Sequence, residues 1–265
     1  PGPRRRARAR PGPVAPAGGA GLTRGGGGRN LGTMRTAPAA LALASTLAAC
    51  GGASFGPPMP TALGPAEGAT VASWVGGTQA TEPVLMRFRW TFIDEKGTAK
   101  GRGSAIILPP DSLRFDFRGP LGSGSGAAAV VGDVPLWAEP EEEVDKLVPN
   151  YPLLWAMLGK ARYPGADDQL RAYTDDRLTA WRYANGADTV DYILVRGESR
   201  QLVVDVRQAG RRIGRVATVL TADGMPESAR LEIPGQPARL DLSFYVAGPL
   251  DAIPPDLWQR PADAQ

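Results

Sequence analysis

The stretch Val84-Leu85-Met86-Arg87-Phe88-Arg89-Trp90-Thr91-Phe92 decides the fold class of this 265-residue chain. Large apolar side chains alternate along it with Arg87, Arg89 and Thr91. Because successive side chains of a strand point to opposite faces, the period of two predicts a β-strand with one apolar and one largely polar face. The turn residues 94–97 follow directly and predict that the chain reverses into a second strand.

Further strand patterns occupy most of the chain after this stretch. The second strand is expected at 100–108, where Gly101 and Gly103 indicate a bulge or a sharp bend. The dipeptide Asn185-Gly186 is the clearest hairpin signal. The other expected strands are 113–117, 127–131, 134–138, 169–174, 178–184, 188–196, 200–208, 211–220, 228–233 and 238–246.

A helical insert interrupts the strands. Residues 139–148 have acids at the start and apolar residues at helical spacing, and a second helix is expected from Tyr151, with Asn150 as its cap. Short turns make the neighbouring strands antiparallel, and a sheet of this size must curl or close. The sequence therefore predicts a mainly β (α+β) fold, a strongly curved antiparallel sheet or unclosed β-barrel of about 11 strands with a helical lid.

The N-terminal part is expected to lie outside this fold. Residues 1–33 are Arg, Gly, Pro and Ala with hardly any large apolar side chain, which predicts disorder and a non-native upstream extension before Met34. Residues 34–49 have the pattern of a lipoprotein signal peptide, with Arg35 ahead of a short apolar run. The run ends in Leu47-Ala48-Ala49-Cys50, and Cys50 is the chain's one cysteine. Residues 50–71 are predicted to be a flexible tether, and 72–265 the folded domain.

Three alternatives for this region stay open. Cys50 could follow an ordinary cleaved signal by chance, residues 1–33 could be a basic arm for nucleic acid or a membrane, and the arginines at 4–6 could belong to a twin-arginine signal. The charge distribution speaks against nucleic acid as a partner. Residues 1–49 hold eight Arg and no acid, so subtracting them from the 30 Lys and Arg leaves 22 basic against 27 acidic residues, a net charge of −5 for the rest of the chain.

Groups for catalysis are scarce in this composition. The chain has no His, which excludes His-based triads and His metal sites. The glycines at 122, 124 and 126 do not open a helix, as a dinucleotide site requires. The acids at 141–143 are expected to be a solvated helix start, and the pairs 167–168 and 175–176 to be turn residues. We expect no enzymatic activity, no metal and no cofactor other than a lipid on Cys50.

The apolar side chains are the remaining candidates for a site. Each of them is individually more typical of core packing. Collectively, a wide curved sheet needs a helix or a ligand to fill its concave side. The candidates for lining such a cavity are Phe88, Trp90, Phe92, Leu113, Phe115, Phe117, Trp137, Leu154, Trp155 and Leu158.

The sequence resembles the LolA/LolB-like family of periplasmic lipoprotein carriers and outer-membrane lipoprotein receptors. The resemblance covers most of residues 82–258. It rests on the strand at 87–90 with the glycine-rich strand after it, and on Pro110-Asp111-Ser112-Leu113-Arg114-Phe115-Asp116-Phe117-Arg118-Gly119-Pro120-Leu121-Gly122. It also rests on Trp155-Ala156-Met157-Leu158-Gly159 and the final run of hairpins.

This resemblance implies an unclosed β-barrel with a helical lid over a cavity for acyl chains. With Cys50 as a lipid anchor, it implies a monomer held on the outer membrane, facing the periplasm, that binds acyl chains of lipoproteins or lipids and receives lipoproteins there. The alternative is an envelope scaffold lipoprotein whose own side chains fill the concave side and whose partner is a protein.

Overall fold

The computed structural model describes residues 55–119, 125–142, 150–198, 200–235 and 238–260. All of them belong to the second of the two units into which the chain divides, Cys50–Gln265. Cys50, the expected signal peptide and the expected upstream extension lie outside the described residues, as does the expected helix at 139–148 beyond residue 142.

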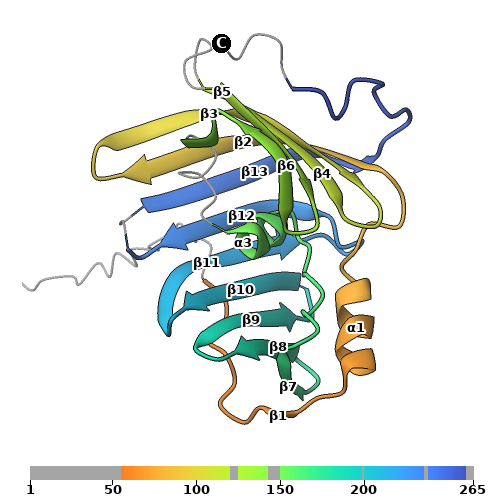
Figure 1. Ribbon diagram of the computed structural model, residues 1–265, viewed down its shortest axis with the longest axis vertical. Coiled ribbons are helices and arrows are strands. Elements are labelled where there is room, and N and C mark those ends of the chain that lie inside the picture. Colours follow the sequence, from red (N-terminus) through yellow and green to blue (C-terminus); the bar gives the residue numbers. More distant parts are fainter. Residues whose placement is uncertain (1–54, 120–124, 143–149, 199, 236–237, 261–265) are drawn as a thin grey trace, which may run out of the picture. The chain divides into compact units, whose positions relative to one another are not determined.

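One antiparallel sheet of 13 strands forms the described fold, in the order β1-β7-β8-β9-β10-β11-β12-β13-β2-β3-β4-β5-β6 (Figure 1). The sheet is open, with β1 and β6 as its edges, which confirms the predicted mainly β, antiparallel and unclosed architecture. The strands are β1 (Gly64–Pro65), β2 (Val84–Asp94), β3 (Gly97–Leu108), β4 (Ser112–Arg118), β5 (Ser125–Val131), β6 (Val134–Glu139), β7 (Gln169–Thr174), β8 (Leu178–Asn185), β9 (Asp188–Val195), β10 (Arg200–Gln208), β11 (Arg211–Leu220), β12 (Pro226–Ile233) and β13 (Ala238–Pro249).

The alternation at 84–92 determines which side of the sheet is which. In β2, Val84, Met86 and Phe88 are buried, whereas Arg87 and Arg89 are exposed. We call the side that carries Phe88 the inner face and the side that carries Arg89 the outer face. The inner face holds the main hydrophobic core, which draws on strands from β2 through β5 and from β8 through β13.

Two short helices have their full bounds within the described residues, α1 (Gly68–Gly76) and α3 (Tyr151–Met157). Helix α1 buries Val71 and Val75 in the main core, and Trp74 packs on Trp181 with 6.0 Å between ring centroids. In the part of the chain that the structure describes, no helix has the length and apolar character required to cross a membrane.

The glycines of β3 do not form a bulge, which was one of the two features that their positions suggested. The pairing of β2 with β3 runs without a register shift, and Gly101 and Gly103 lie directly opposite Trp90 and Phe88. A Cβ atom built on Gly103 would lie 2.6 Å from Cζ of Phe88. These glycines therefore provide room for aromatic rings that lie across the neighbouring strand.

The segment predicted to be a flexible tether makes contacts in its described part, from Phe55 onward. Phe55 and Met59 pack on a small outer-face cluster with Val203, and Arg215 donates hydrogen bonds to the carbonyl oxygens of Phe55 (2.8 Å) and Pro57 (2.9 Å). Strand β1 then pairs with β7. The structure departs from an unattached tether because the guanidinium and the apolar cluster offer this segment specific partners.

Candidate functional site

Helix α3 lies against the inner face and is held by hydrogen bonds from both directions along the sheet. Oγ1 of Thr218, on β11, donates to the carbonyl oxygen of Ala156 (2.7 Å), and Nε1 of Trp155 donates to that of Gly132, in the β5–β6 turn (2.8 Å). In a flat sheet β11 and β5 would be roughly 29 Å apart, whereas a seven-residue helix is about 10 Å long. The sheet must therefore curve around α3.

Arg162, in the segment after α3, contacts residues from two distant parts of the sheet. Its guanidinium pairs with Asp133 in the β5–β6 turn (Nε–Oδ1 3.2 Å) and with Asp111 in the β3–β4 turn (Nη2–Oδ2 3.8 Å). It lies over the Trp155 ring at 4.9 Å. On the opposite side, its carbonyl oxygen accepts a hydrogen bond from the Tyr183 hydroxyl on β8 (2.9 Å).

The aromatic pair Trp181 and Tyr192 fills the β8–β9 end of the inner face. Their rings stack at 5.2 Å between centroids, and Nε1 of Trp181 donates to the Tyr183 hydroxyl (3.0 Å). Burial raises the pKa of both Tyr183 and Tyr192. Both hydroxyls therefore stay protonated at neutral pH and act as structural hydrogen-bonding groups.

Nine of the ten residues predicted to line a cavity meet in the main core. Phe88 and Phe115 stack at 5.5 Å between ring centroids, and Trp90 meets the edge of Phe117 at 6.2 Å. Phe92 is partly buried against this core. The others that belong to it are Leu113, Leu154, Trp155 and Leu158. These side chains pack mainly on one another, so they form the floor of the inner face.

Trp137 is the tenth, and the structure places it in another cluster, with Ala127 and Ala129. Arg114 lies over its ring at 4.7 Å, and its Nε1 donates to the carbonyl oxygen of Trp258 (2.9 Å). The register shift between Ala129 and Val130 in the β5–β6 pairing governs which side of the edge strand this ring occupies. Trp137 thus serves mainly to dock the C-terminal segment.

Asn150 precedes α3 as expected, but its side chain makes no capping hydrogen bond. One reason is Pro152 at the second helical position, which has no N–H to donate. Among the described residues, Oδ1 of Asn150 is buried without a hydrogen-bond partner. An unpaired buried amide oxygen is costly, and here it borders an open pocket.

That pocket, which we call the end pocket, has a volume of about 500 Å³ and lies between the β5–β6 hairpin and the start of α3. Its size falls in the ~300–1,000 Å³ range of ligand sites. Its apolar lining comes from Ala128, Val130, Pro135, Leu136, Trp137, Ala138, Tyr151, Pro152 and Leu154, and its polar lining from Asp133, Glu141, Asn150 and Arg260. It joins an apolar floor to a charged rim, as an amphiphilic ligand requires.

Of the residues that line the end pocket, Trp137 and Leu154 were predicted from the sequence. Tyr151, Pro152 and Leu136 were not. The apolar stripe of α3 and the alternation of β6 could have pointed to Tyr151 and Leu136. No pattern in the sequence indicates that the two elements leave a gap between them.

Groups for covalent or metal chemistry are not assembled in the described residues. No cluster of three or more Cys, Asp or Glu there could hold a metal ion. The buried cation Lys160 has its pKa lowered to about 8 by burial.

Comparisons with known proteins give matches among solved structures. No protein-family model and no curated protein matches the sequence. A domain assigned to outer membrane lipoprotein sorting, from Vibrio parahaemolyticus, is 7% identical and covers 72% of this chain and 95% of its own, with a TM-score of 0.44. A LolA superfamily protein from Nitrosomonas europaea is 10% identical and covers 74% and 98%, with a TM-score of 0.36.

MucB is 14% identical to this chain, with coverage of 75% of this chain and 65% of its own and a TM-score of 0.35. The structure is thus similar to a LolA superfamily protein, a lipoprotein-sorting domain and MucB.

Proposed function

We propose that this protein is a lipid-anchored envelope protein that binds acyl chains of lipoproteins or lipids in the end pocket and receives lipoproteins at the outer membrane. The observation that carries the proposal is the end pocket itself, an opening of about 500 Å³ onto the apolar floor of the inner face. Each buried CH₂ contributes about 0.8 kcal/mol, so an acyl chain is held without any catalytic group. The protein acts as a monomer in this proposal.

The sequence at 47–50 supports the anchor in this proposal. A single cysteine at the end of a short apolar run, after two small residues, is the pattern of a lipidated N-terminus. Phe55, five residues later, is bound on the outer face of the sheet. The anchor would therefore be attached close to the domain.

The experiment is a titration with a fluorescent fatty acid on two matched variants. Leu136 lines the end pocket and is 53% exposed, whereas Ile253 is 52% exposed and is not among the residues that line it. Leu136→Asp introduces a charge into the pocket and is expected to weaken binding about tenfold or more, since burying an unpaired carboxylate is costly. Ile253→Asp is expected to leave Kd unchanged. Equal Kd values for Leu136→Asp and the wild type would contradict the proposal.

A second function, an envelope scaffold without a lipid ligand, is favoured by one observation. All the side chains from Leu153 to Leu158 are buried, so α3 fills the inner face with the protein's own atoms. On this hypothesis mass spectrometry of the purified protein detects no bound lipid and the fluorescent fatty acid is not taken up. Detection of a stoichiometric acyl ligand would exclude it.

A further inference from the structure

The outer face of β2, β3 and β4 carries a row of three arginines, Arg89, Arg102 and Arg118. The register pairs Arg89 directly with Arg102, and Arg102 directly with Arg118. Adjacent strands are about 4.8 Å apart, so three guanidinium-bearing chains rise side by side from neighbouring strands. We call these three residues the arginine row. Arg87 and Lys100 are exposed on the same face beside it.

None of these five cations has a carboxylate within ion-pair distance among the described residues. Like charges directly opposite one another destabilise a sheet. Two other arginines of the outer face do have carboxylate partners, Arg182 with Asp191 and Arg230 with Asp241. The arginine row therefore lacks a counter-charge from the described protein and is suited to an external anion.

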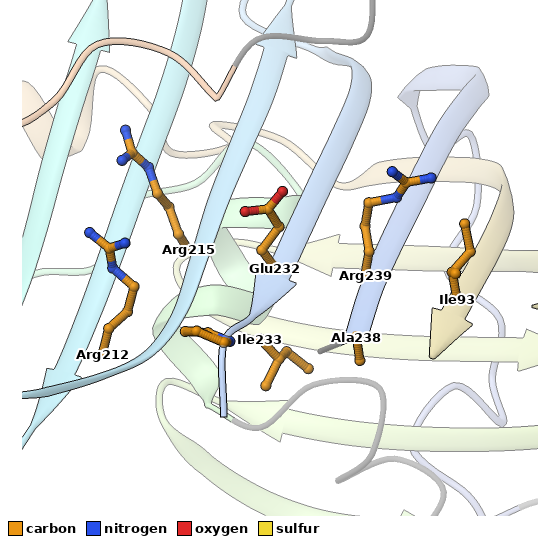
Figure 2. Close-up of a pocket in the computed structure, with 8 residues that line it drawn as sticks. Ile93, Arg212, Arg215, Glu232, Ile233, Ala238 and Arg239 are labelled. Carbon is orange, nitrogen blue, oxygen red and sulfur yellow. The ribbon is translucent and has the colours of Figure 1, made fainter. Parts of the chain in front are cut away.

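Three further arginines and Glu232 line a pocket of about 370 Å³ on the outer face (Figure 2), and one of these arginines, Arg239, is paired with Asp241. Figure 2 shows Arg212 and Arg215 of β11, Glu232 of β12 and Arg239 of β13 on the same side of the sheet. Arg212 shares Asp205 with another arginine, and Arg215 has no carboxylate within ion-pair distance among the described residues. The apolar residues Ile93, Ile233 and Ala238 complete the lining.

Exposed apolar side chains accompany these cations. Tyr245 is 48% exposed and lies 5.2 Å below the guanidinium carbon of Arg89, and Val246 beside it is also exposed. Tyrosine and arginine together are typical of surfaces at the interface between membrane and water. The positive charge of the arginine row contrasts with the net charge of −5 that residues 50–265 carry together.

We propose that the outer face binds anionic phospholipid headgroups and thereby orients the domain on the membrane. The position of the N-terminal segment supports a membrane as the partner. Phe55 lies on this face, within 6.0 Å of both Arg215 and Arg230. Cys50 precedes Phe55 by five residues, and five residues reach at most ~18 Å. This orientation rests on the proposed anchor, and it turns the inner face and its end pocket away from the bilayer.

The experiment measures vesicle binding of the full chain with Cys50→Ser, which removes the acceptor of the anchor. Vesicles contain equal parts of phosphatidylglycerol and phosphatidylcholine, or phosphatidylcholine alone. The test variant adds Arg89→Gln, Arg102→Gln and Arg118→Gln. The control variant adds Arg171→Gln, Arg177→Gln and Arg211→Gln, which removes the same charge from exposed positions outside the arginine row. All proteins retain residues 1–49, so the contribution of their eight arginines is the same throughout.

The test variant is expected to bind the anionic vesicles about 100-fold more weakly than its parent, since each basic residue at such a surface contributes a factor of about five. The control variant is expected to lose much less. Binding by the parent is expected to fall as NaCl is raised from about 0.1 M to about 0.5 M. Equal losses for the two variants, no preference for anionic vesicles, or no binding by the parent would overturn the proposal.

The same samples, titrated with the fluorescent fatty acid, separate this proposal from the proposed function. A test variant that retains fatty-acid binding but loses vesicle binding supports the outer-face assignment. A parent that binds vesicles through the arginine row but takes up no fatty acid leaves the outer-face assignment standing and contradicts the acyl-binding function alone. If an acidic protein binds to the arginine row and anionic vesicles do not, the lipid assignment is wrong.

Discussion

The ammonium group of Lys160 lies in the packed part of the protein, where the residue is 4% exposed. Burial lowers its pKa from 10.5 to about 8. Because the folded state binds this proton less tightly than the unfolded state, stability is lowest below pH 8 and rises as the pH increases from about 8 toward 10.5. One pKa unit corresponds to about 1.4 kcal/mol, so the cost at neutral pH is on the order of 3 kcal/mol.

Lys160→Met is therefore expected to raise the free energy of unfolding at pH 7 by up to about 3 kcal/mol. Urea unfolding of both proteins between pH 7 and 9.5 checks this, and the difference between them is expected to shrink as the pH rises. The raised pKa values of Tyr183 and Tyr192 lower stability only above pH 10 and are common to both proteins. A difference that is independent of pH would contradict the account of Lys160.

A substitution at Gly103 tests whether the ring of Phe88 packs over this glycine. A Cβ at this position would lie 2.6 Å from Cζ of Phe88 and 2.7 Å from the carbonyl oxygen of Asp116. Gly103→Ala is expected to cost about 1–3 kcal/mol of stability by overpacking. Gly248→Ala, in a strand position with open space around it, is the control and is expected to change stability by less than about 0.5 kcal/mol. Equal thermal unfolding of both variants would refute this role for Gly103.

At the scale of elements, α3 and the β5–β6 hairpin define the end pocket, and Arg162 links them. Arg162→Met keeps an aliphatic chain over Trp155 but removes both ion pairs with Asp111 and Asp133. Because these carboxylates are partly exposed, the expected loss of global stability is small, about 1 kcal/mol. Hydrogen exchange of the β5–β6 hairpin is expected to accelerate, while that of β9–β11 stays unchanged. Uniform acceleration across the sheet would contradict a local link.

The sequence predicted the strands because alternation with a period of two is strong here. The expected strand 211–220 is β11 itself, and 200–208 is β10. Helix α1 was missed because its Gly, Thr, Val and Ser residues have low intrinsic helix propensity. It is stabilised by burial of Val71 and Val75 in the core, which a local pattern does not reveal.

The sequence predicted the apolar residues that form the floor of the inner face, but it did not predict the end pocket. Phe88 in β2 and Phe115 and Phe117 in β4 were identified because each lies on the apolar face of its strand. The face on which a residue lies follows from the sequence spacing alone. Trp137 lines the end pocket but lies outside the main core, in a cluster with Ala127 and Ala129 next to the register shift of the β5–β6 pairing. The end pocket depends on the distance between a helix and a hairpin, which is set by long-range contacts such as Trp155 with Gly132.

At the scale of the whole molecule, the two faces of the sheet differ in character. The inner face is apolar, holds α3 and opens at the end pocket. The outer face carries the arginine row and the bound N-terminal segment. The proposed binding of acyl chains uses the inner face, and the proposed binding of anionic headgroups uses the outer face.

The most direct test of acyl binding is photo-cross-linking of the full chain with a fatty acid that carries a diazirine near its methyl end, followed by mass spectrometry of the peptides. The account predicts cross-links in the end pocket, at residues such as Val130, Leu136, Tyr151 and Leu154, and their loss when unlabelled fatty acid competes. Cross-links confined to outer-face strands, or labelling that unlabelled fatty acid does not reduce, would contradict it.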